Sequence, residues 1–235
     1  MHREDHRDGW QFLAHELHES FELLPVWASF VVMTLPGNPL PIMETFYTLQ
    51  GEGAFVGSPA YFIRVGGCDV GCVWCDVKES WDADSHPKLD VSDVVDEAAT
   101  YPARIAVVTG GEPLMYDMGP LTSALRSAGF RTHLETSGAY PISGEWHWIC
   151  FSPKKFKKPV EGIHEKAHEL KVIVANKHDL KWALEHAANV SASCAKYLQP
   201  EWDKADQVTP MILEFVKEHP EWRVSLQTHK YLDIP

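Results

Sequence analysis

Short β-branched segments alternate with helical segments along most of this sequence, and this alternation limits the folds that it can adopt. Strands are predicted at 60–65, 104–109, 130–135, 147–151, 170–174, 197–199 and 222–227, and helices at 91–99, 120–128, 179–188 and 209–219. Strands separated by helices favour parallel βαβ units, because a parallel strand needs a crossover connection. The pattern therefore predicts an α/β fold with mostly parallel strands, built as one layered domain or a partial barrel.

A cluster of polar or glycine residues follows five of the predicted strands. Cys68 comes shortly after the strand at 60–65, and Gly110-Gly111-Glu112-Pro113 comes directly after 104–109. The other clusters are Glu135-Thr136-Ser137-Gly138, Ser152-Pro153-Lys154 and Gln199-Pro200. In a parallel sheet these clusters converge at one edge, where α/β proteins place their chemistry.

Three of the five cysteines, Cys68, Cys72 and Cys75, are crowded into one short segment. Three thiolates at this spacing can hold three corners of a cubane iron–sulfur cluster, which leaves the fourth iron open to a ligand. A zinc site completed by a histidine is the alternative, although structural zinc usually uses two separated cysteine pairs. Cys150 and Cys194 lie in apolar segments typical of buried small side chains. Crowded thiols also favour a reducing compartment, so we expect a cytoplasmic protein.

The composition excludes several classes of protein. The 235 residues are 45% hydrophobic, which is enough for one sizeable core. A formal net charge of −12 argues against a partner such as duplex nucleic acid. The sequence has no apolar stretch of the roughly 18–20 residues that a membrane span needs, so no membrane partner is expected either.

Two parts of the chain are predicted to differ in role. Residues 1–41 are expected to form an N-terminal extension and linker, and residues 42–235 the folded domain. The head of the chain lacks the basic flank of a signal peptide. A stretch rich in proline and glycine at 33–39 is typical of a linker, and Met33 is an alternative start of the native chain.

The pattern Cys68-x-x-x-Cys72-x-x-Cys75, followed by a strand that ends in Gly110-Gly111-Glu112-Pro113, resembles the radical S-adenosylmethionine (SAM) superfamily. Segments across the rest of the chain resemble one of its families, the 7-carboxy-7-deazaguanine synthases of queuosine and deazapurine biosynthesis. These segments are 46–53, 109–113, 135–138, 152–154, 169–172 and 227–235. The similarity runs from about residue 42 to the last residue, and it implies a single-domain partial (β/α) barrel of the radical SAM type.

The resemblance also implies a reaction and its cofactors. The three cysteines would hold a [4Fe-4S] cluster, and SAM would chelate the fourth iron. A 5′-deoxyadenosyl radical derived from SAM would abstract a hydrogen atom from 6-carboxy-5,6,7,8-tetrahydropterin, whose ring would contract to 7-carboxy-7-deazaguanine with loss of ammonia. SAM would then be regenerated, and no side chain is expected to be catalytic beyond this radical, because the cofactor performs the difficult step.

The site residues implied by the resemblance fall into two sets. The positions that match substrate-binding residues are Leu49, Gln50, Gly51, Glu52, Arg64, Thr109, His229 and Pro235. Those that match SAM-binding residues are Trp74, Cys75, Asp76, Gly111, Glu112, Ser152, Pro153, Lys154, Gln199, Pro200, Glu201 and Trp202. Arg64 and His229 could instead be ordinary surface residues, and Glu52 and the segment 152–154 could belong to simple turns.

One position departs from the pattern of the family. The family commonly has a threonine or serine two residues after the last cysteine, where the hydroxyl binds Mg²⁺. Val77 stands at this position and has no side-chain oxygen. Mg²⁺ could still bind through water, the substrate, Asp76 or Glu79, because this ion readily keeps several waters. The need for Mg²⁺ is therefore left open.

The expected partners are a small pterin substrate, an electron donor such as flavodoxin or ferredoxin, and a second copy of the chain in a homodimer. Two other functions share parts of the pattern. A short radical SAM enzyme that activates glycyl-radical proteins has the same cysteine spacing, but it would not need the tail at 227–235. A non-catalytic iron–sulfur electron carrier would have no use for the Gly-Gly-Glu-Pro segment or for an open iron.

Overall fold

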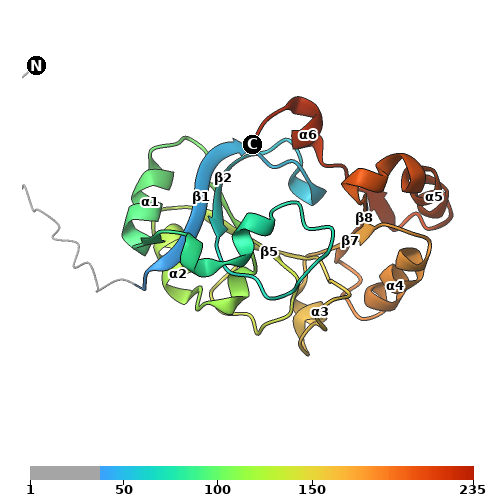
Figure 1. The fold of residues 1–235 in the computed structure, drawn as a ribbon, viewed down its shortest axis with the longest axis horizontal. Helices are drawn as coiled ribbons and strands as arrows, with labels where there is room; N and C mark the ends of the chain where they lie inside the picture. The colour runs from blue at the N-terminus through green and yellow to red at the C-terminus, as the bar shows by residue number, and fades with distance from the viewer. Residues whose placement is uncertain (1–37) are drawn as a thin grey trace, which may run out of the picture. The chain divides into compact units, whose positions relative to one another are not determined.

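The computed structural model describes residues 38–235, and nine strands of this part of the chain form one sheet (Figure 1). Their order is β3-β1-β2-β4-β5-β6-β7-β8-β9. Because β3 and β9 stand at opposite ends of this order, the sheet is an open, partial barrel. The bounds are β1 Leu40–Leu49, β2 Pro59–Val65, β3 Lys88–Leu89, β4 Ile105–Gly110, β5 Arg131–Thr136, β6 Trp148–Phe151, β7 Glu169–Val174, β8 Ala195–Pro200 and β9 Trp222–Val224.

Neighbouring strands from β2 to β9 all run parallel, which confirms the predicted α/β fold. β1 is the exception, because it pairs antiparallel with both β2 and β3. The sequence prediction has no strand before residue 60. Most side chains of β1 are half-buried, so the segment shows neither a clean alternation of apolar and polar residues nor a continuous apolar run.

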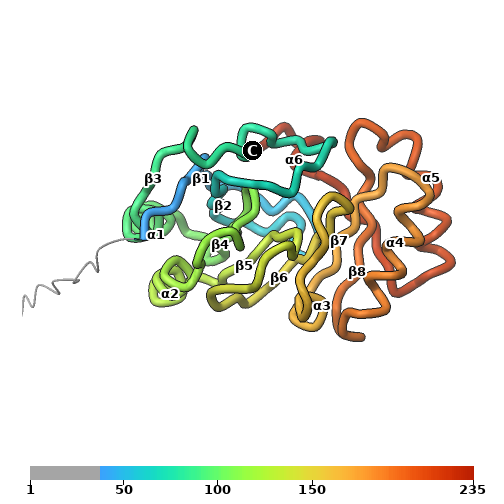
Figure 2. Tube along the Cα trace, turned by 60° about the horizontal axis from the view of Figure 1, so that its bottom comes forward, coloured from blue at the N-terminus to red at the C-terminus, as the bar shows by residue number. Residues whose placement is uncertain are grey.

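The described residues form six α-helices, and Figure 2 shows α2 to α5 around the outside of the strands. α1 covers the predicted residues 91–99. The predicted start of the helix at 209 is wrong, because α5 begins at Ala205 and holds Pro210 inside the helix instead of at its first turn. The bounds are α1 Val91–Ala99, α2 Gly119–Ser127, α3 Ile163–Lys166, α4 His178–Ala187, α5 Ala205–Glu218 and α6 Thr228–Leu232.

The end of the chain also differs from the prediction. The last strand, β9, stops at Val224 instead of 227. Directly after β9, the Ser225 hydroxyl donates to Gln199 Oε1 at 2.8 Å and accepts from the Gly53 backbone N–H at 3.0 Å. The chain then enters α6, which is too short to give a periodic signal in the sequence.

Successive residues of the parallel strands face opposite sides of the sheet. Side chains such as Ile63 and Val108 pack against α1 and α2, and Val172 packs against α4 and α5. Their sequence neighbours face the interior of the partial barrel, where Arg64 of β2 stands beside Thr109 of β4. Polar residues on this inner face therefore project into the barrel, while the outer face forms the core under the helices.

The predicted extension lies mostly outside the described residues. Residues 1–37 and the alternative start at Met33 are not described, and β1 begins at Leu40, two residues before the expected domain start. No helix within residues 38–235 combines the length and apolar character needed to cross a membrane.

Candidate active site

A cavity of about 680 Å³ opens at the carboxyl ends of the parallel strands. All five polar clusters that the sequence places after strands contribute to its wall, as parallel pairing predicts. Every predicted substrate and SAM residue lines this cavity except Pro153, which is buried between Ser152 and Lys154. The structure thus brings together segments that are up to 186 residues apart in sequence, from Leu49 to Pro235.

The cysteine loop, residues 68–76, follows β2 and carries Cys68, Cys72 and Cys75 to the cavity wall. All three are free thiols. Burial raises the pKa of Cys72 to about 11 and also raises that of Cys68. Because iron binds the thiolate, binding of a cluster would have to displace these protons. Without a bound metal group, Cys68 and Cys72 therefore favour the neutral thiol, which is a weak nucleophile.

Glycines join the cysteine loop to the end of β4. The backbone N–H groups of Gly111 and Glu112 donate to the carbonyl oxygens of Val65 and Gly67, both at 2.9 Å. A Cβ on Gly111 would overlap the Gly67 carbonyl oxygen, so only glycine permits this approach. The Gly-Gly-Glu-Pro segment is thereby fixed against the start of the cysteine loop.

The three thiols have the chemistry that an iron–sulfur cluster needs. Within residues 38–235 no three His, Cys, Asp or Glu side chains are grouped so that they could hold one metal ion. A cubane cluster instead takes each thiolate at a separate corner. Cys150 and Cys194 lie outside the cavity wall and are buried, as predicted for small core side chains.

Glu112 acts within the protein framework. Its carboxylate is buried and accepts hydrogen bonds from the Thr136 hydroxyl at 2.6 Å, the Ser137 backbone N–H at 2.8 Å and the Leu114 backbone N–H at 3.2 Å. The Ser137 hydroxyl is a further donor. These bonds tie the end of β4 to the end of β5, so Glu112 holds two cavity walls together.

A buried lysine joins two carboxylates at the floor of the cavity. Lys171 Nζ lies 2.6 Å from Glu52 Oε2 and 2.9 Å from Glu135 Oε2, and its side chain is only 5% exposed. Burial alone would raise the pKa of Glu52, but Lys171 outweighs burial and lowers this pKa to about 2. Glu52 is therefore an anion facing the cavity. Gln50 reaches the same group, with its Nε2 3.5 Å from Glu135 Oε1.

Lys171 and Glu135 are absent from the predicted site list, although the motifs at 135–138 and 169–172 contain them. Each could have been identified from the sequence as a charged residue inside a segment that is otherwise typical of a buried strand. The sequence alone could not say which face of the strand each occupies. The register settles this, because Glu135 pairs with Cys150, Cys150 with Glu169, and Lys171 is two residues further along the same inner face.

On the wall formed by the cysteine loop and the end of β6, Lys154 packs over an aromatic ring. Its Nζ lies 5.4 Å from the centre of the Trp74 ring and 2.6 Å from Ser152 Oγ. Burial lowers the pKa of Lys154. The Ser225 hydroxyl donates to Gln199 Oε1 and so holds the Gln199 side chain in place. The Glu201 carboxylate accepts from the Asp203 backbone N–H at 3.2 Å, which caps the short turn that carries Trp202.

The position of Val77 bears on Mg²⁺. Val77 lines the cavity with a side chain that offers no oxygen ligand. The neighbouring Asp76 already accepts, through Oδ2, from Gln227 Nε2 at 3.3 Å and from Lys230 Nζ at 3.1 Å. The residues present at this point therefore do not form an evident protein site for the ion.

Comparisons with known proteins identify the family. The model of the radical SAM superfamily matches residues 62–149, which include the cysteine loop and the Gly-Gly-Glu-Pro segment. A 7-carboxy-7-deazaguanine synthase from Flavobacterium psychrophilum is 57% identical over 199 residues, which cover 85% of this chain and 94% of the relative. The chain belongs to the 7-carboxy-7-deazaguanine synthase family. It is accordingly a radical SAM enzyme with an α/β partial barrel.

Two further comparisons agree with membership of the 7-carboxy-7-deazaguanine synthase family. A synthase of this name from Synechocystis sp. is 48% identical, and the match covers 83% of this chain and 93% of the relative. The crystal structure of QueE from Escherichia coli superposes with a TM-score of 0.72 at 34% identity, covering 81% of this chain and 95% of the other. The superfamily implies a [4Fe-4S] cluster and SAM, which the three thiols and the glycine-lined wall fit.

Proposed function

We propose that the chain converts 6-carboxy-5,6,7,8-tetrahydropterin to 7-carboxy-7-deazaguanine with loss of ammonia. One observation carries this proposal: a single cavity holds the three cysteine thiols, an anionic carboxylate, a guanidinium and the end of the chain. The product and ammonia together contain every atom of the substrate, so the reaction needs no net oxidant. When bound, the reduced cluster and SAM would supply hydrogen-atom abstraction from carbon, which ordinary side chains cannot perform.

The residues near β1 and β2 are suited to bind the pterin. Glu52 is an anion that can accept hydrogen bonds from the N–H groups of the ring. Arg64 can bind the substrate carboxylate. Its Nε lies 2.6 Å from Glu44 Oε1, and the guanidinium has further N–H groups that can donate to the substrate. Leu49, Gln50, Gly51 and Thr109 complete this wall. His229 lies against Gly51, and it lines the cavity together with Pro235, the residue whose terminal carboxylate could accept hydrogen bonds from the ring.

The residues on the opposite wall are suited to hold the cluster and SAM. Cys68, Cys72 and Cys75 would ligate iron. Lys154 can bind the SAM carboxylate, and the backbone of Gly111, which packs against Gly67, lines the same part of the cavity. The other proposed SAM contacts are Trp74, Asp76, Glu112, Ser152, Pro153, Gln199, Pro200, Glu201 and Trp202.

The proposal extends to the surroundings of the enzyme. The electron that reduces the cluster would come from a small redox carrier such as flavodoxin or ferredoxin, and the chain would work as a homodimer in the cytoplasm. The radical SAM domain, expected from residue 42, would begin with β1 at Leu40, and the residues before it would form an extension. Mg²⁺ would bind through water, substrate oxygens, Asp76 or Glu79, because Val77 supplies no side-chain oxygen.

The test is an anaerobic reaction of the reconstituted protein with SAM, a reductant and 6-carboxy-tetrahydropterin, followed by mass spectrometry. We expect 7-carboxy-7-deazaguanine. Cleavage of SAM without this product would contradict the substrate and favour another short radical SAM activity, such as glycyl-radical activation. A reducible cluster that leaves SAM intact would instead indicate an electron carrier.

A further inference from the structure

The C-terminal segment, residues 227–235, is fastened to three separate parts of the cavity wall. Thr228 donates its backbone N–H and its hydroxyl to the Gly51 carbonyl oxygen, each at 2.9 Å. Lys230 Nζ lies 3.1 Å from Asp76 Oδ2 and 4.8 Å from the centre of the Trp202 ring. Gly51 follows β1, Asp76 belongs to the cysteine loop and Trp202 follows β8, so this segment spans the cavity mouth.

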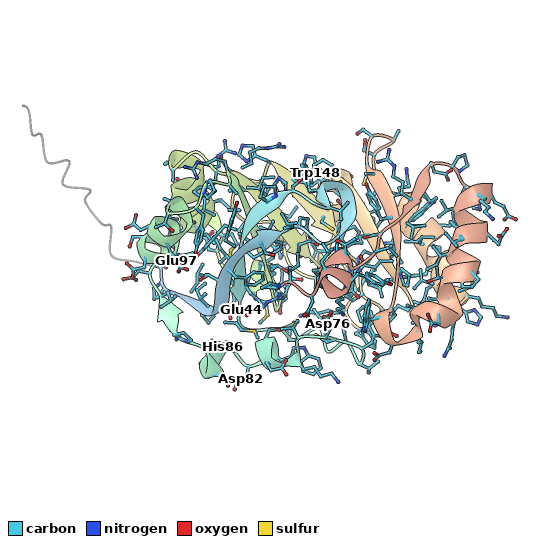
Figure 3. All side chains as sticks on the ribbon, turned by 90° about the horizontal axis from the view of Figure 1, so that it is seen from above. Glu44, Asp76, Asp82, His86, Glu97 and Trp148 are labelled. Atoms are coloured by element: carbon cyan, nitrogen blue, oxygen red, sulfur yellow. The ribbon has the colours of Figure 1, made fainter. Side chains whose placement is uncertain are left out.

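Lys230 and Gln227 both bond to Asp76 Oδ2, at 3.1 and 3.3 Å, and Lys230 alone of the two also packs over the Trp202 ring, so it contacts the proposed SAM region more fully. Asp76 directly follows Cys75, and both Asp76 and Trp202 are on the SAM side of the wall. His229 and Pro235, on either side of Lys230 in sequence, are on the proposed pterin side. Figure 3 shows Asp76 beside the short C-terminal helix α6. Movement of the segment would therefore break a contact with the cysteine loop.

The exposure of this ion pair suits a contact that opens and closes. The Asp76 side chain is 56% exposed and that of Lys230 is 22% exposed, so solvent weakens the pair. The Lys171 pair with Glu52 is buried and would cost far more to break. A segment that covers a substrate must also release a product, and a partly exposed pair permits this.

We propose that Lys230 is a positioning residue that couples closure of the C-terminal segment over the pterin to the SAM-bound arrangement of the cysteine loop. Bound SAM orders Asp76 and Trp202, the two residues that Lys230 contacts. The ordered Lys230 in turn keeps the rest of the C-terminal segment, with His229 and Pro235, over the substrate. Linkage is reciprocal, so bound pterin must then strengthen the binding of SAM by the same factor. The inference takes the identity of the two ligands from the proposed function.

The experiment measures binding without turnover. The anaerobic holoenzyme, with its cluster oxidised and no reductant present, is titrated with SAM in the absence and presence of saturating 6-carboxy-tetrahydropterin. In the native protein the pterin should lower the Kd of SAM by at least about fivefold. In Lys230→Met this factor should fall to about one, whereas the Kd of SAM without pterin stays within about twofold of the native value. Lys230→Arg, which keeps the charge, should retain most of the coupling.

Lys217→Met is the matched control, because Lys217 forms an exposed pair with Glu214 on α5. It should keep the native coupling. A second measurement follows the segment itself: with SAM bound, hydrogen exchange of residues 227–235 should be faster in Lys230→Met than in the native protein and the control. A merely structural role would change cluster content and melting temperature, and neither should move.

Two results would overturn the inference, and they differ. Native coupling and unchanged exchange in Lys230→Met would contradict the role of Lys230 while the proposed function stands. A native holoenzyme that binds SAM but does not bind the pterin at all would remove the proposed substrate, and with it the coupling.

Discussion

At the scale of single residues, the charge balance of the cavity depends on Lys171. Burial would lower the pKa of this amine, but its anionic neighbours raise it well above its usual value. The lysine in turn keeps Glu52 ionised inside the barrel. One buried cation thus pairs with two carboxylates, Glu52 and Glu135, that would otherwise repel each other.

Lys171→Met should therefore destabilise the protein strongly. Two carboxylates would be left without their buried cation, and breaking a buried pair in this way typically costs about 3–5 kcal/mol of unfolding free energy. Chemical denaturation of the purified protein measures the loss. Lys217→Met, which removes an exposed pair, should change stability by less than about 1 kcal/mol. Equal stability of the two variants would contradict the role given to Lys171.

His133 makes the stability depend on pH. Its Nε2 is buried without a hydrogen-bond partner among the described residues, and its ring lies 4.5 Å from that of Phe55. Burial, assisted by Arg131, lowers its pKa from 6.5 to about 4. The unfolded chain therefore binds a proton at higher pH than the folded one, so stability is full above pH 6.5 and is lost as the pH falls towards 4.

Replacing His133 should reduce the loss of unfolding free energy at acidic pH. His133→Phe is expected to lose less unfolding free energy between pH 6.5 and pH 4 than the native protein, as measured by denaturant titrations across that range. Some loss should persist, because burial also lowers the pKa of His186 to about 4. The exposed His178 provides the control, and His178→Gln should follow the native curve. An unchanged slope in His133→Phe would show that this histidine does not set it.

At the scale of elements, the ends of β4 and β5 are joined by one carboxylate. Every hydrogen bond that the Glu112 carboxylate accepts comes from a donor on the turn after β4 or at the end of β5. Glu112→Gln would place an amide N–H₂ against one of these donors, so the loss should be about 1–3 kcal/mol of unfolding free energy. The exposed Glu145, paired with Arg126, supplies the comparison, and Glu145→Gln should be nearly neutral. Equal effects would contradict the joining role.

The sequence anticipates the parallel strands and most helices because their apolar periodicity is strong. α1 is predicted to the residue, whereas α5 begins earlier than predicted because Pro210 is accepted inside the helix. β1 is missed because most of its side chains are half-buried, so its sequence shows no clean alternation of apolar and polar residues. α3 and α6 have too few residues for a period to appear.

At the scale of the whole molecule, the site is assembled by topology. Motifs place the cysteines, the glycines and the tail in the sequence, and parallel pairing brings them to one cavity at the carboxyl ends of the strands. Only the strand register places the charged side chains of Glu135 and Lys171 on the inner face of the sheet, because a shift of one residue would turn each to the other face. The contacts of Lys230 likewise depend on where the tail folds back.

The central claim is that this cavity runs radical SAM chemistry in which SAM returns unchanged. The most direct measurement is the ratio of 7-carboxy-7-deazaguanine formed to SAM consumed, in an anaerobic reaction with excess 6-carboxy-tetrahydropterin and a reductant. Because SAM is regenerated, many product molecules should form for each SAM molecule consumed. One SAM consumed for each product would contradict the regeneration of SAM, and no product at all would contradict the function assigned to the cavity.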